Sequence, residues 1–156
     1  MDKNNYLTDE LIVLSCNIDD FNPQNYEYIS DRLFTEAKVL DVWLTPIIMK
    51  KSRSANTLSV LTHKQNKLKC LDILFEETST LGVREEKILR YSLQREFKIA
   101  DTIYGKINCK IAKRGEEILN ISAEYEDCKK SAKLHHVPLK QVQQTALTKL
   151  REELNL

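Results

Sequence analysis

The hydrophobic positions of this chain change period several times, and each change marks the end of a predicted element. An apolar run over residues 11–17 predicts a strand. Residues 23–38 then predict an amphipathic helix, with apolar side chains at Tyr26, Ile29, Leu33 and Ala37. A β-rich run over residues 42–49 and a strand over residues 57–62, joined by a turn at Ser52–Asn56, predict a hairpin.

A second helix and a fourth strand complete this first pattern. Residues 66–78 predict a helix with one apolar face, made of Leu68, Leu71, Leu74, Phe75 and Thr78, and residues 83–91 predict a strand. Pro46 cannot donate to a central ladder, so it places its strand at a sheet edge or a bulge. The order β-α-β-β-α-β predicts an α+β protein with a ferredoxin-like core over residues 11–91, after a polar lead-in at residues 1–10.

The rest of the chain, residues 92–156, predicts a β-hairpin, a short strand and a terminal helix pair packed on the core. The hairpin spans residues 92–113 with a turn at Tyr104–Lys106, and Leu93, Phe97 and Ile99 share one of its faces. The last helix carries its own apolar face, at Leu139, Val142, Ala146 and Leu150. A hairpin is marginal unless one face is covered, so either these helices or a neighbouring subunit should cover it.

Composition narrows the classes of function. The formal net charge of +1 gives no bulk electrostatic reason to expect nucleic acid or membrane binding. No apolar stretch has the length of a membrane span, and the polar start is not a signal peptide, so we expect a cytoplasmic protein. Four scattered cysteines without a Cys-x-x-Cys motif predict reduced, buried thiols rather than a zinc site or a disulfide framework: Cys16, Cys70, Cys109 and Cys128.

The candidate chemistry lies in two polar clusters that each follow an apolar run. Asp19 and Asp20 come after the first strand, and Asn22–Pro23 resembles the start of a helix, with Asn22 as the N-cap. Lys50–Arg53 follows the second run. Carboxylates bind Mg²⁺ or Mn²⁺, and Lys and Arg neutralise phosphate, so the two clusters predict a metal–nucleotide site if they meet in space. Apart, they would be a capping turn and a solvated basic turn.

A third polar segment, residues 78–84, contains the Thr80 hydroxyl, a flexible Gly82 and the Arg84 guanidinium. It does not have the glycine and lysine spacing of a P-loop, so an ordinary turn after a helix is the alternative interpretation. The terminal helix pair superficially resembles a helix-turn-helix, but the last helix mixes acidic and basic residues, which argues against reading DNA.

Four segments, in this order and spacing, resemble the motifs of one family: Asn17–Pro23, Asp41–Lys51, Glu77–Arg84 and Ser122–Cys128. It is the family of CTP-dependent nickel-insertion proteins of nickel-pincer cofactor biosynthesis, which serve lactate racemase. The resemblance covers roughly residues 11–150, and the chain is similar to the carboxy-terminal domain of that family. Four motifs in register are more specific than any single cluster described above.

The resemblance implies an enzyme of the lyase class, a cyclometallase that inserts nickel into pyridinium-3,5-bisthiocarboxylic acid mononucleotide. It implies Ni²⁺ as a substrate and CTP with Mn²⁺ or Mg²⁺, with CTP hydrolysed to CMP and pyrophosphate, and it implies that the ferredoxin-like carboxy-terminal domain binds CTP. We therefore expect Asp19 and Asp20 to bind the cation. The residues expected at the nucleotide are Asn17, Lys50, Lys51, Arg53, Thr80 and Arg84.

Members of the family also carry a His-rich amino-terminal domain, and this sequence begins almost at the first motif. We therefore expect complete nickel insertion to need that domain or chain, with lactate racemase as the recipient of the cofactor. We also expect a homo-oligomer, and no DNA or membrane partner. The alternative is a non-catalytic ferredoxin-like interaction or RNA-binding module. Trp43 is the only Trp, and the Lys/Arg-Gly-aromatic pattern of RNA-recognition folds is missing, which weakens that alternative.

Overall fold

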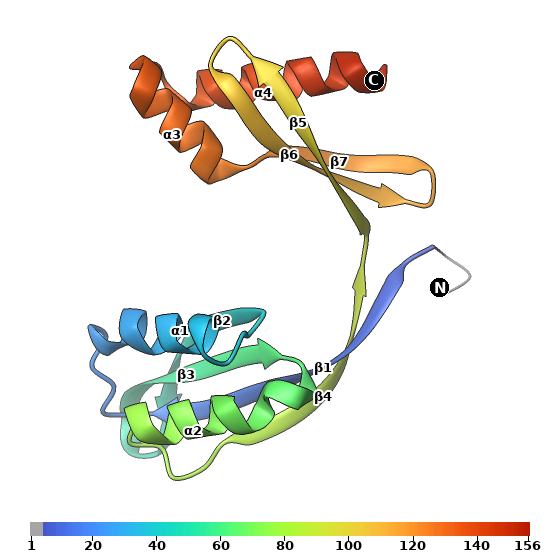
Figure 1. Cartoon of the computed structure of the whole chain (residues 1–156). Coiled ribbons are helices and arrows are strands. Elements are labelled where there is room, and N and C mark those ends of the chain that lie inside the picture. Colours follow the sequence, from blue (N-terminus) through green and yellow to red (C-terminus); the bar gives the residue numbers. More distant parts are fainter. Residues whose placement is uncertain (1–4) are drawn as a thin grey trace. The chain divides into compact units, whose positions relative to one another are not determined.

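The structure is a computed structural model that describes residues 5–156 (Figure 1). The chain divides into two compact units. Residues 9–90 form the N-terminal unit, and residues 91–156 together with residues 5–8 form the C-terminal unit. Each unit has its own hydrophobic core, made by a sheet and two helices.

The N-terminal unit is built on a four-stranded sheet with the order β2-β3-β1-β4. β1 pairs antiparallel with β3, and β3 pairs antiparallel with β2. This strand order and the element order β-α-β-β-α-β confirm the predicted ferredoxin-like arrangement. The strands are β1 (Leu7–Ile18), β2 (Asp41–Met49), β3 (Arg53–Thr62) and β4 (Arg84–Ser92), and the helices are α1 (Asn25–Thr35) and α2 (Lys67–Glu77), with short 3₁₀ turns at Lys50–Ser52 and Lys64–Asn66.

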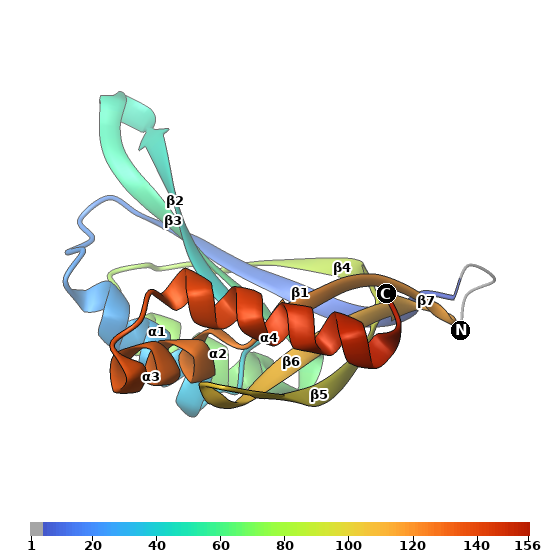
Figure 2. The same ribbon diagram turned by 90° about the horizontal axis from the view of Figure 1, so that it is seen from above.

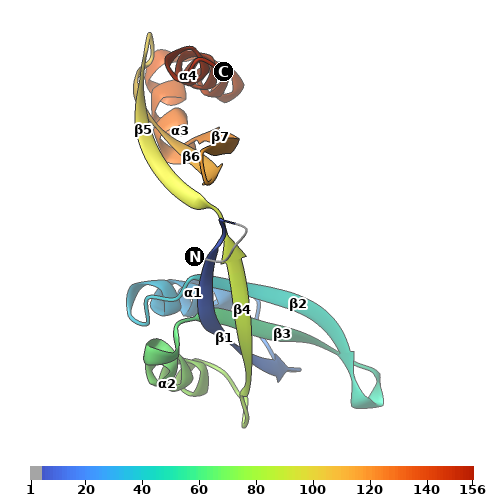
Figure 3. The same cartoon turned by 90° about the vertical axis from the view of Figure 1, so that its right-hand side faces the viewer.

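One face of this sheet packs against both helices (Figure 3). Alternate residues of β1 from Ile12 to Ile18 are buried on that face, because successive side chains of a strand point to opposite sides. Helix α1 buries Ile29 and Leu33 there, and Ala37 beyond its end is buried too, as the sequence predicted. The other face carries no helix, and it is the face on which Ser15 and Asn17 lie.

The predicted apolar face of α2 is wrong in part. Leu68 and Phe75 are 71% and 48% exposed, whereas Cys70, Ile73 and Leu74 are fully buried. These three also stand at helical spacing, so the sequence of α2 holds two overlapping apolar stripes. Periodicity alone cannot choose between them, and packing against the sheet selects the stripe that contains Cys70 and Ile73.

The start of α1 also differs from the prediction. The helix begins at Asn25 rather than directly after Asn22, and its N-cap position is Gln24. Asn22 does accept a backbone hydrogen bond as a capping residue would, from the Gln24 N–H at 3.1 Å to its Oδ1, but it does so within a turn that precedes the helix.

The β2–β3 hairpin is longer than predicted. Its turn is Lys50–Ser52 rather than Ser52–Asn56, because β3 already begins at Arg53. β3 pairs with β2 as far as Arg53 but with β1 only as far as Asn56, so the hairpin tip extends past the end of β1 (Figure 2). Pro46 lies on β2 at the sheet edge, as predicted.

The C-terminal unit has a three-stranded antiparallel sheet with the order β5-β6-β7. Helices α3 and α4 cover one face of it, where Ile107, Cys109 and Ile111 are buried (Figure 1). The predicted apolar face of the last helix is confirmed, since Val142, Ala146 and Leu150 are buried and Leu139 is partly buried against the same core. The elements are β5 (Gln94–Thr102), β6 (Gly105–Arg114), β7 (Glu117–Ala123), α3 (Tyr125–His135) and α4 (Leu139–Leu154).

The opposite face of this second sheet carries exposed apolar side chains. Phe97 and Ile99 are 64% and 55% exposed, and their cross-strand partners are Lys110 and Asn108. The terminal helices therefore cover the face with Ile107, and no helix among the described residues of this unit lies on the face with Phe97. The predicted packing of residues 92–156 on the core stays a prediction.

All four cysteines are buried and free, as predicted. Within residues 5–156, no helix combines the length and the apolar character needed to span a membrane.

Candidate functional site

Three loops meet at one end of the four-stranded sheet, and they carry most of the predicted site residues. The β1–α1 loop contacts the β2–β3 hairpin through an ion pair between Asp19 and Arg53, the first residue of β3. It contacts the α2–β4 loop through a hydrogen bond between Ser79 and Asp20. The acidic and basic clusters, which are far apart in the sequence, are therefore adjacent in the fold.

The Asp19–Arg53 pair joins the two clusters directly. Nη1 of Arg53 lies 2.8 Å from Oδ2 of Asp19. The hydrogen bond from Arg53, together with the positive charges of Arg53 and Lys50, holds the pKa of Asp19 below its ordinary value of 3.8. Asp19 is therefore ionised at neutral pH and stands beside two cationic side chains, which is the charge pattern expected of a site for a cation and a polyphosphate.

Asp20 points to different partners from its neighbour. Its Oδ1 accepts a hydrogen bond from Ser79, and it lines a small pocket of about 240 Å³ together with Glu76 and Glu77. Asp19 and Asp20 are thus not brought to one point. In the described part of the chain, no three His, Cys, Asp or Glu side chains gather closely enough to hold a metal ion by themselves. A single carboxylate is nevertheless a common protein contribution to Mg²⁺ that arrives with substrate phosphates.

Arg84 is held in place on the helix-free face of the sheet. Its Nη2 donates to Oδ1 of Asn17 at 2.7 Å, and its Nε donates to Oγ of Ser15 at 3.3 Å. Thr57, the cross-strand neighbour of Asn17, donates to the same Oδ1 at 2.8 Å. The structure brings the two predicted residues Asn17 and Arg84 together, and it adds Ser15 and Thr57, which the sequence analysis did not single out. The contact between Thr57 and Asn17 depends on the β1–β3 register, which the local sequence pattern does not specify.

The basic turn has an unusual backbone. Lys51 and Ser52 both have positive φ, at 61° and 55°, which is the left-handed region that non-glycine residues avoid. Each such residue costs on the order of 1–2 kcal/mol. Lys50 and Lys51 are exposed at this turn, and the charge of Lys50 reaches Asp19. A tight, strained turn thus carries two exposed lysines next to Arg53 in the sequence, and the charge of one of them, Lys50, acts on Asp19.

The side chain of Thr80 forms hydrogen bonds within its own loop. Its Oγ1 donates to the carbonyl of Gly82 at 3.0 Å and accepts a longer hydrogen bond from the Gly82 N–H at 3.4 Å. Burial raises the pKa of the Cys16 thiol, while Thr80 and Arg84 act in the opposite direction. Thr80 thus bonds within the α2–β4 loop, and its predicted contact with the nucleotide stays a prediction.

Comparison with known proteins identifies the family of this chain. The profile of a family described as "Nickel insertion protein" matches residues 1–143 of the chain. The chain belongs to this family. Proteins described as pyridinium-3,5-bisthiocarboxylic acid mononucleotide nickel insertion proteins are similar to it: that of Acetivibrio thermocellus is 44% identical over 136 residues, and that of Clostridium kluyveri is 39% identical over 147 residues.

These relatives are much longer than the chain. The two alignments cover 87% and 94% of this chain but only 33% and 36% of the relatives, so the chain spans about a third of their length. The motifs found in the sequence therefore led to the correct family. The activity of a full-length relative, however, belongs to a protein about three times as long.

Solved structures show which part of the longer relatives corresponds to this chain. The structure of LarC2, the C-terminal domain of a cyclometallase involved in the synthesis of the NPN cofactor of lactate racemase, is similar with a TM-score of 0.86 and 33% identity. The match covers 92% of this chain and 99% of that domain. A protein from Methanopyrus kandleri shares the fold, with a TM-score of 0.67 at 21% identity. The resemblance to a carboxy-terminal domain of the family is confirmed.

Proposed function

We propose that this chain is the nucleotide-binding part of a nickel insertase that makes the nickel-pincer cofactor. In this proposal the whole enzyme inserts nickel into pyridinium-3,5-bisthiocarboxylic acid mononucleotide and uses CTP with Mn²⁺ or Mg²⁺. Family membership supports the reaction. The observation that carries the role of this chain is the Asp19–Arg53 pair, because it joins an ionised carboxylate to a cationic turn.

Binding of a metal–triphosphate would exchange the partners of this ion pair. Asp19 would bind the divalent cation that the triphosphate carries, and Arg53 would turn to a phosphate oxygen. Each charge keeps a partner of opposite sign in both states. Because both side chains are partly exposed, the ion pair contributes little stability and can open when the ligand binds.

The neighbouring cations would complete the phosphate site. Lys50 and Lys51 are mobile point charges on an exposed turn, suited to a flexible polyphosphate. Arg84 uses two of its five N–H donors on Asn17 and Ser15, which leaves further donors for a phosphate oxygen. If CTP is cleaved to CMP and pyrophosphate, these cations would stabilise the charge that develops on the leaving pyrophosphate.

The rest of the proposal concerns the whole enzyme. We propose that a His-rich amino-terminal domain or chain acts with this one, that nickel is the cargo of the reaction, and that lactate racemase receives the finished cofactor. We also propose a cytoplasmic location and a homo-oligomeric assembly. The exposed Phe97 and Ile99, two residues apart on one face of β5, support the assembly, because adjoining exposed apolar side chains are typical of protein–protein contacts.

A thermal-shift panel tests the proposal. The chain would be melted with CTP, ATP, GTP or UTP, each with Mn²⁺, and with a single-stranded RNA that tests the alternative of an RNA-binding module. Mn²⁺-CTP at 100 times its dissociation constant should stabilise the fold by about 2.7 kcal/mol. No rise of the melting temperature in millimolar Mn²⁺-CTP would contradict the proposal, and a rise with RNA alone would favour the alternative.

A matched pair of variants localises the effect. Arg53→Gln removes the cation that pairs with Asp19, and Arg90→Gln removes the cation that pairs with Asp9 at 3.0 Å elsewhere in the same unit. Both changes delete one partly exposed Arg–Asp ion pair. Only Arg53→Gln should reduce the shift caused by Mn²⁺-CTP, and equal losses in the two variants would point to a general electrostatic effect instead.

A further inference from the structure

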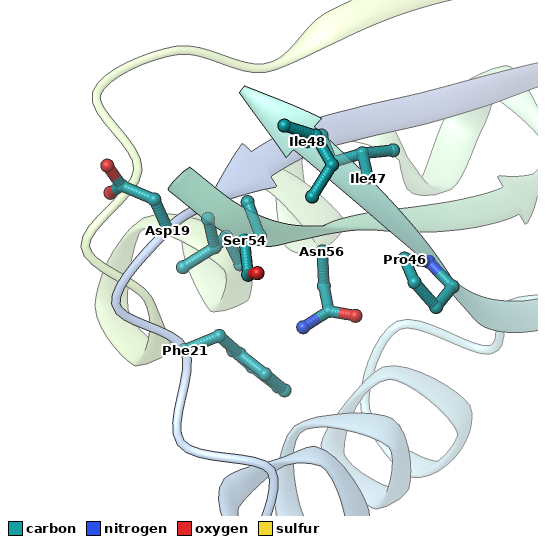
Figure 4. Close-up of a pocket in the computed structure, with 9 residues that line it drawn as sticks. Asp19, Phe21, Pro46, Ile47, Ile48, Ser54 and Asn56 are labelled. Atoms are coloured by element: carbon teal, nitrogen blue, oxygen red, sulfur yellow. The ribbon is translucent and has the colours of Figure 1, made fainter. Parts of the chain in front are cut away.

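The four-stranded sheet is much longer than the helices that pack on it. The 12 residues of β1 follow about 40 Å of strand, whereas the 11 residues of α1 or of α2 extend over about 16 Å. A pocket opens at each end of the sheet. One, of about 530 Å³, includes Asp19 and adjoins the proposed phosphate site (Figure 4). The other, of about 450 Å³, is lined by β1, β4 and the 3₁₀ turn before α2, and we name it the β1–β4 pocket.

The floor of the β1–β4 pocket continues the side of the sheet that faces the helices. Ile12 belongs to the core of the N-terminal unit, and Glu10 lies on the same side of β1, because alternate residues of a strand face the same way. On β4, Glu85 pairs with a lysine of α2, so Lys87 and Leu89 face the helices as well. Leu89 is 53% exposed, so apolar surface is open to water at this end of the sheet.

Three charged side chains surround this apolar floor. Lys64, in the 3₁₀ turn before α2, and Lys87 contribute two ammonium groups, and Glu10 contributes one carboxylate. All three are exposed, and within residues 5–156 none of them forms an ion pair. Close by on the same two strands, Asp9 and Arg90 do pair with each other. The three charges of the β1–β4 pocket are therefore available to a ligand.

The kinds of group in the pocket restrict the ligand. Apolar walls with a few charged groups, at a volume of a few hundred Å³, are typical of sites for small organic ligands. Two ammonium groups favour two anionic groups on the ligand, and the apolar floor favours a flat, apolar body between them. The carboxylate of Glu10 disfavours further negative charge on that body and favours a positive charge there.

We propose that the β1–β4 pocket binds a planar aromatic dianion whose ring is positively charged. Lys64 and Lys87 each contact one anionic group, and Glu10 faces the ring cation. The inference rests on the proposed function, because pyridinium-3,5-bisthiocarboxylic acid mononucleotide has this chemistry, a pyridinium ring between two thiocarboxylates. The pocket is then the place where this domain holds the precursor of the cofactor.

The β1–β4 pocket and the proposed phosphate site are far apart within one chain. Glu10 and Ile18 are eight residues apart on β1, which corresponds to about 27 Å along the strand, and Asp19 follows Ile18. A nucleotide at Asp19 therefore does not contact a ring ligand in the β1–β4 pocket of the same chain. The two sites can be tested independently, with separate probes.

Titrations of the ¹⁵N-labelled chain with two ring probes, followed by NMR, test the inference. N-methylpyridinium-3,5-dicarboxylate carries the ring charge, and benzene-1,3-dicarboxylate has the same two carboxylates without it. Both should bind at millimolar concentration and shift the amide signals of Leu11, Ile12 and Ile88, which line the pocket. Lys64→Gln and Lys87→Gln should each weaken both probes by about fivefold, the upper end for a solvent-exposed ion pair.

Glu10→Gln tests the charge of the ring. It should weaken the pyridinium probe by about twofold, because it removes the carboxylate that faces the cation. It should strengthen the benzene probe by a similar factor, because it removes a charge of the same sign as the carboxylates. Glu86→Gln, one residue from Lys87 but on the opposite face of β4, and Lys98→Gln, at an exposed position of β5, are the matched controls and should change neither affinity.

A parallel titration with Mn²⁺-CTP separates this inference from the proposed function. Wild-type chain that binds Mn²⁺-CTP but neither ring probe would overturn the ring site while the phosphate site stands. Unchanged affinity in both Lys64→Gln and Lys87→Gln would do the same, and a change of the same sign for both probes in Glu10→Gln would overturn the assignment to a cationic ring. Wild-type chain that binds the ring probes but not Mn²⁺-CTP would overturn the phosphate site alone. The amide spectrum also shows whether each variant is folded.

Discussion

The N-terminal and C-terminal units share one construction and differ in the face that the helices leave open. Each covers one face of an antiparallel sheet with two helices and buries its apolar residues there. On the open face of the N-terminal unit, Ser15, Asn17, Thr57 and Arg84 form a hydrogen-bonded group. On the open face of the C-terminal unit, Phe97 and Ile99 are exposed.

This difference shows that the two faces of a sheet can have separate roles, one in stability and the other in binding. The covered face supplies stability in both units, because it removes apolar surface from water. The open face is then available for binding. A polar, fixed face with charged loops suits a ligand, and an apolar face suits association with another protein surface. The comparison predicts that changes in the two units should affect different measurements.

The largest expected effect is the loss of stability caused by substitutions in the two hydrophobic cores. Ile73→Ala in the N-terminal unit and Ile107→Ala in the C-terminal unit each remove a fully buried side chain. Each should cost about 2–5 kcal/mol of the free energy of unfolding of its own unit. Trp43, the only Trp, lies in the N-terminal unit, so urea unfolding followed by Trp fluorescence reports that unit alone.

Far-UV circular dichroism completes this experiment, since it reports both units. If the units unfold separately, Ile73→Ala shifts the fluorescence transition and Ile107→Ala shifts only part of the dichroism transition. Equal fluorescence shifts in the two variants would mean that the units unfold together. The two units would then differ in their open faces but would not have separate stabilities.

The second prediction compares two hairpin turns. Lys50→Ala or Lys51→Ala should weaken Mn²⁺-CTP by about 10- to 100-fold, because a charge-assisted hydrogen bond contributes roughly 1.5–3 kcal/mol. Lys106→Ala, an exposed Lys beside the β5–β6 turn of the other unit, is the control and should change nothing. Calorimetry measures the affinities. Unchanged affinity in both Lys50→Ala and Lys51→Ala would show that this is a solvated basic turn that does not contact the nucleotide.

The third prediction concerns the open face of the C-terminal unit. Phe97→Glu should weaken self-association by about tenfold, since burial of the exposed part of a Phe contributes on the order of 1–2 kcal/mol. Sedimentation should show a shift toward monomer while far-UV circular dichroism stays native. Leu134→Glu, at a position of α3 that is 75% exposed, is the matched control. A wild-type chain that already sediments as a monomer of 18.2 kDa would rule the idea out.

How much of this could be predicted from the sequence depends on which contacts decide each feature. Local periodicity was sufficient for the order of elements and for the apolar faces of α1 and α4. It failed for α2, because two stripes compete there and only the sheet selects the one with Ile73. The contacts of Arg84 with Ser15 and of Thr57 with Asn17 depend on strand register, which no local pattern specifies.

The smallest expected effect is the acid sensitivity of a surface network in the N-terminal unit. Arg32 binds Glu36, Glu76 and Glu77, and its hydrogen bond to Glu36, with that from Lys69, lowers the pKa of Glu36 from 4.5 to about 2. The folded-state pKa lies below the unfolded value. The stabilisation is therefore complete above pH 4.5 and is lost as the pH falls toward 2.

Arg32→Gln should make the stability of the N-terminal unit less dependent on pH in that range, as followed by Trp43 fluorescence in urea. Arg114→Gln, which removes the pairing with Glu117 in the other unit, should leave the fluorescence transition unchanged. A pH dependence that is the same in wild type and Arg32→Gln would show that the network does not control acid unfolding.

The left-handed residues of the β2–β3 turn, Lys51 and Ser52, have a consequence for protein engineering. Glycine would relieve the backbone at either position, so a design procedure that optimises stability alone would choose Lys51→Gly. That choice would raise the melting temperature and delete an ammonium group from the proposed phosphate site in a single step. The turn is thus a place where a more robust protein and a working one require different residues, and a screen for heat resistance would select against binding.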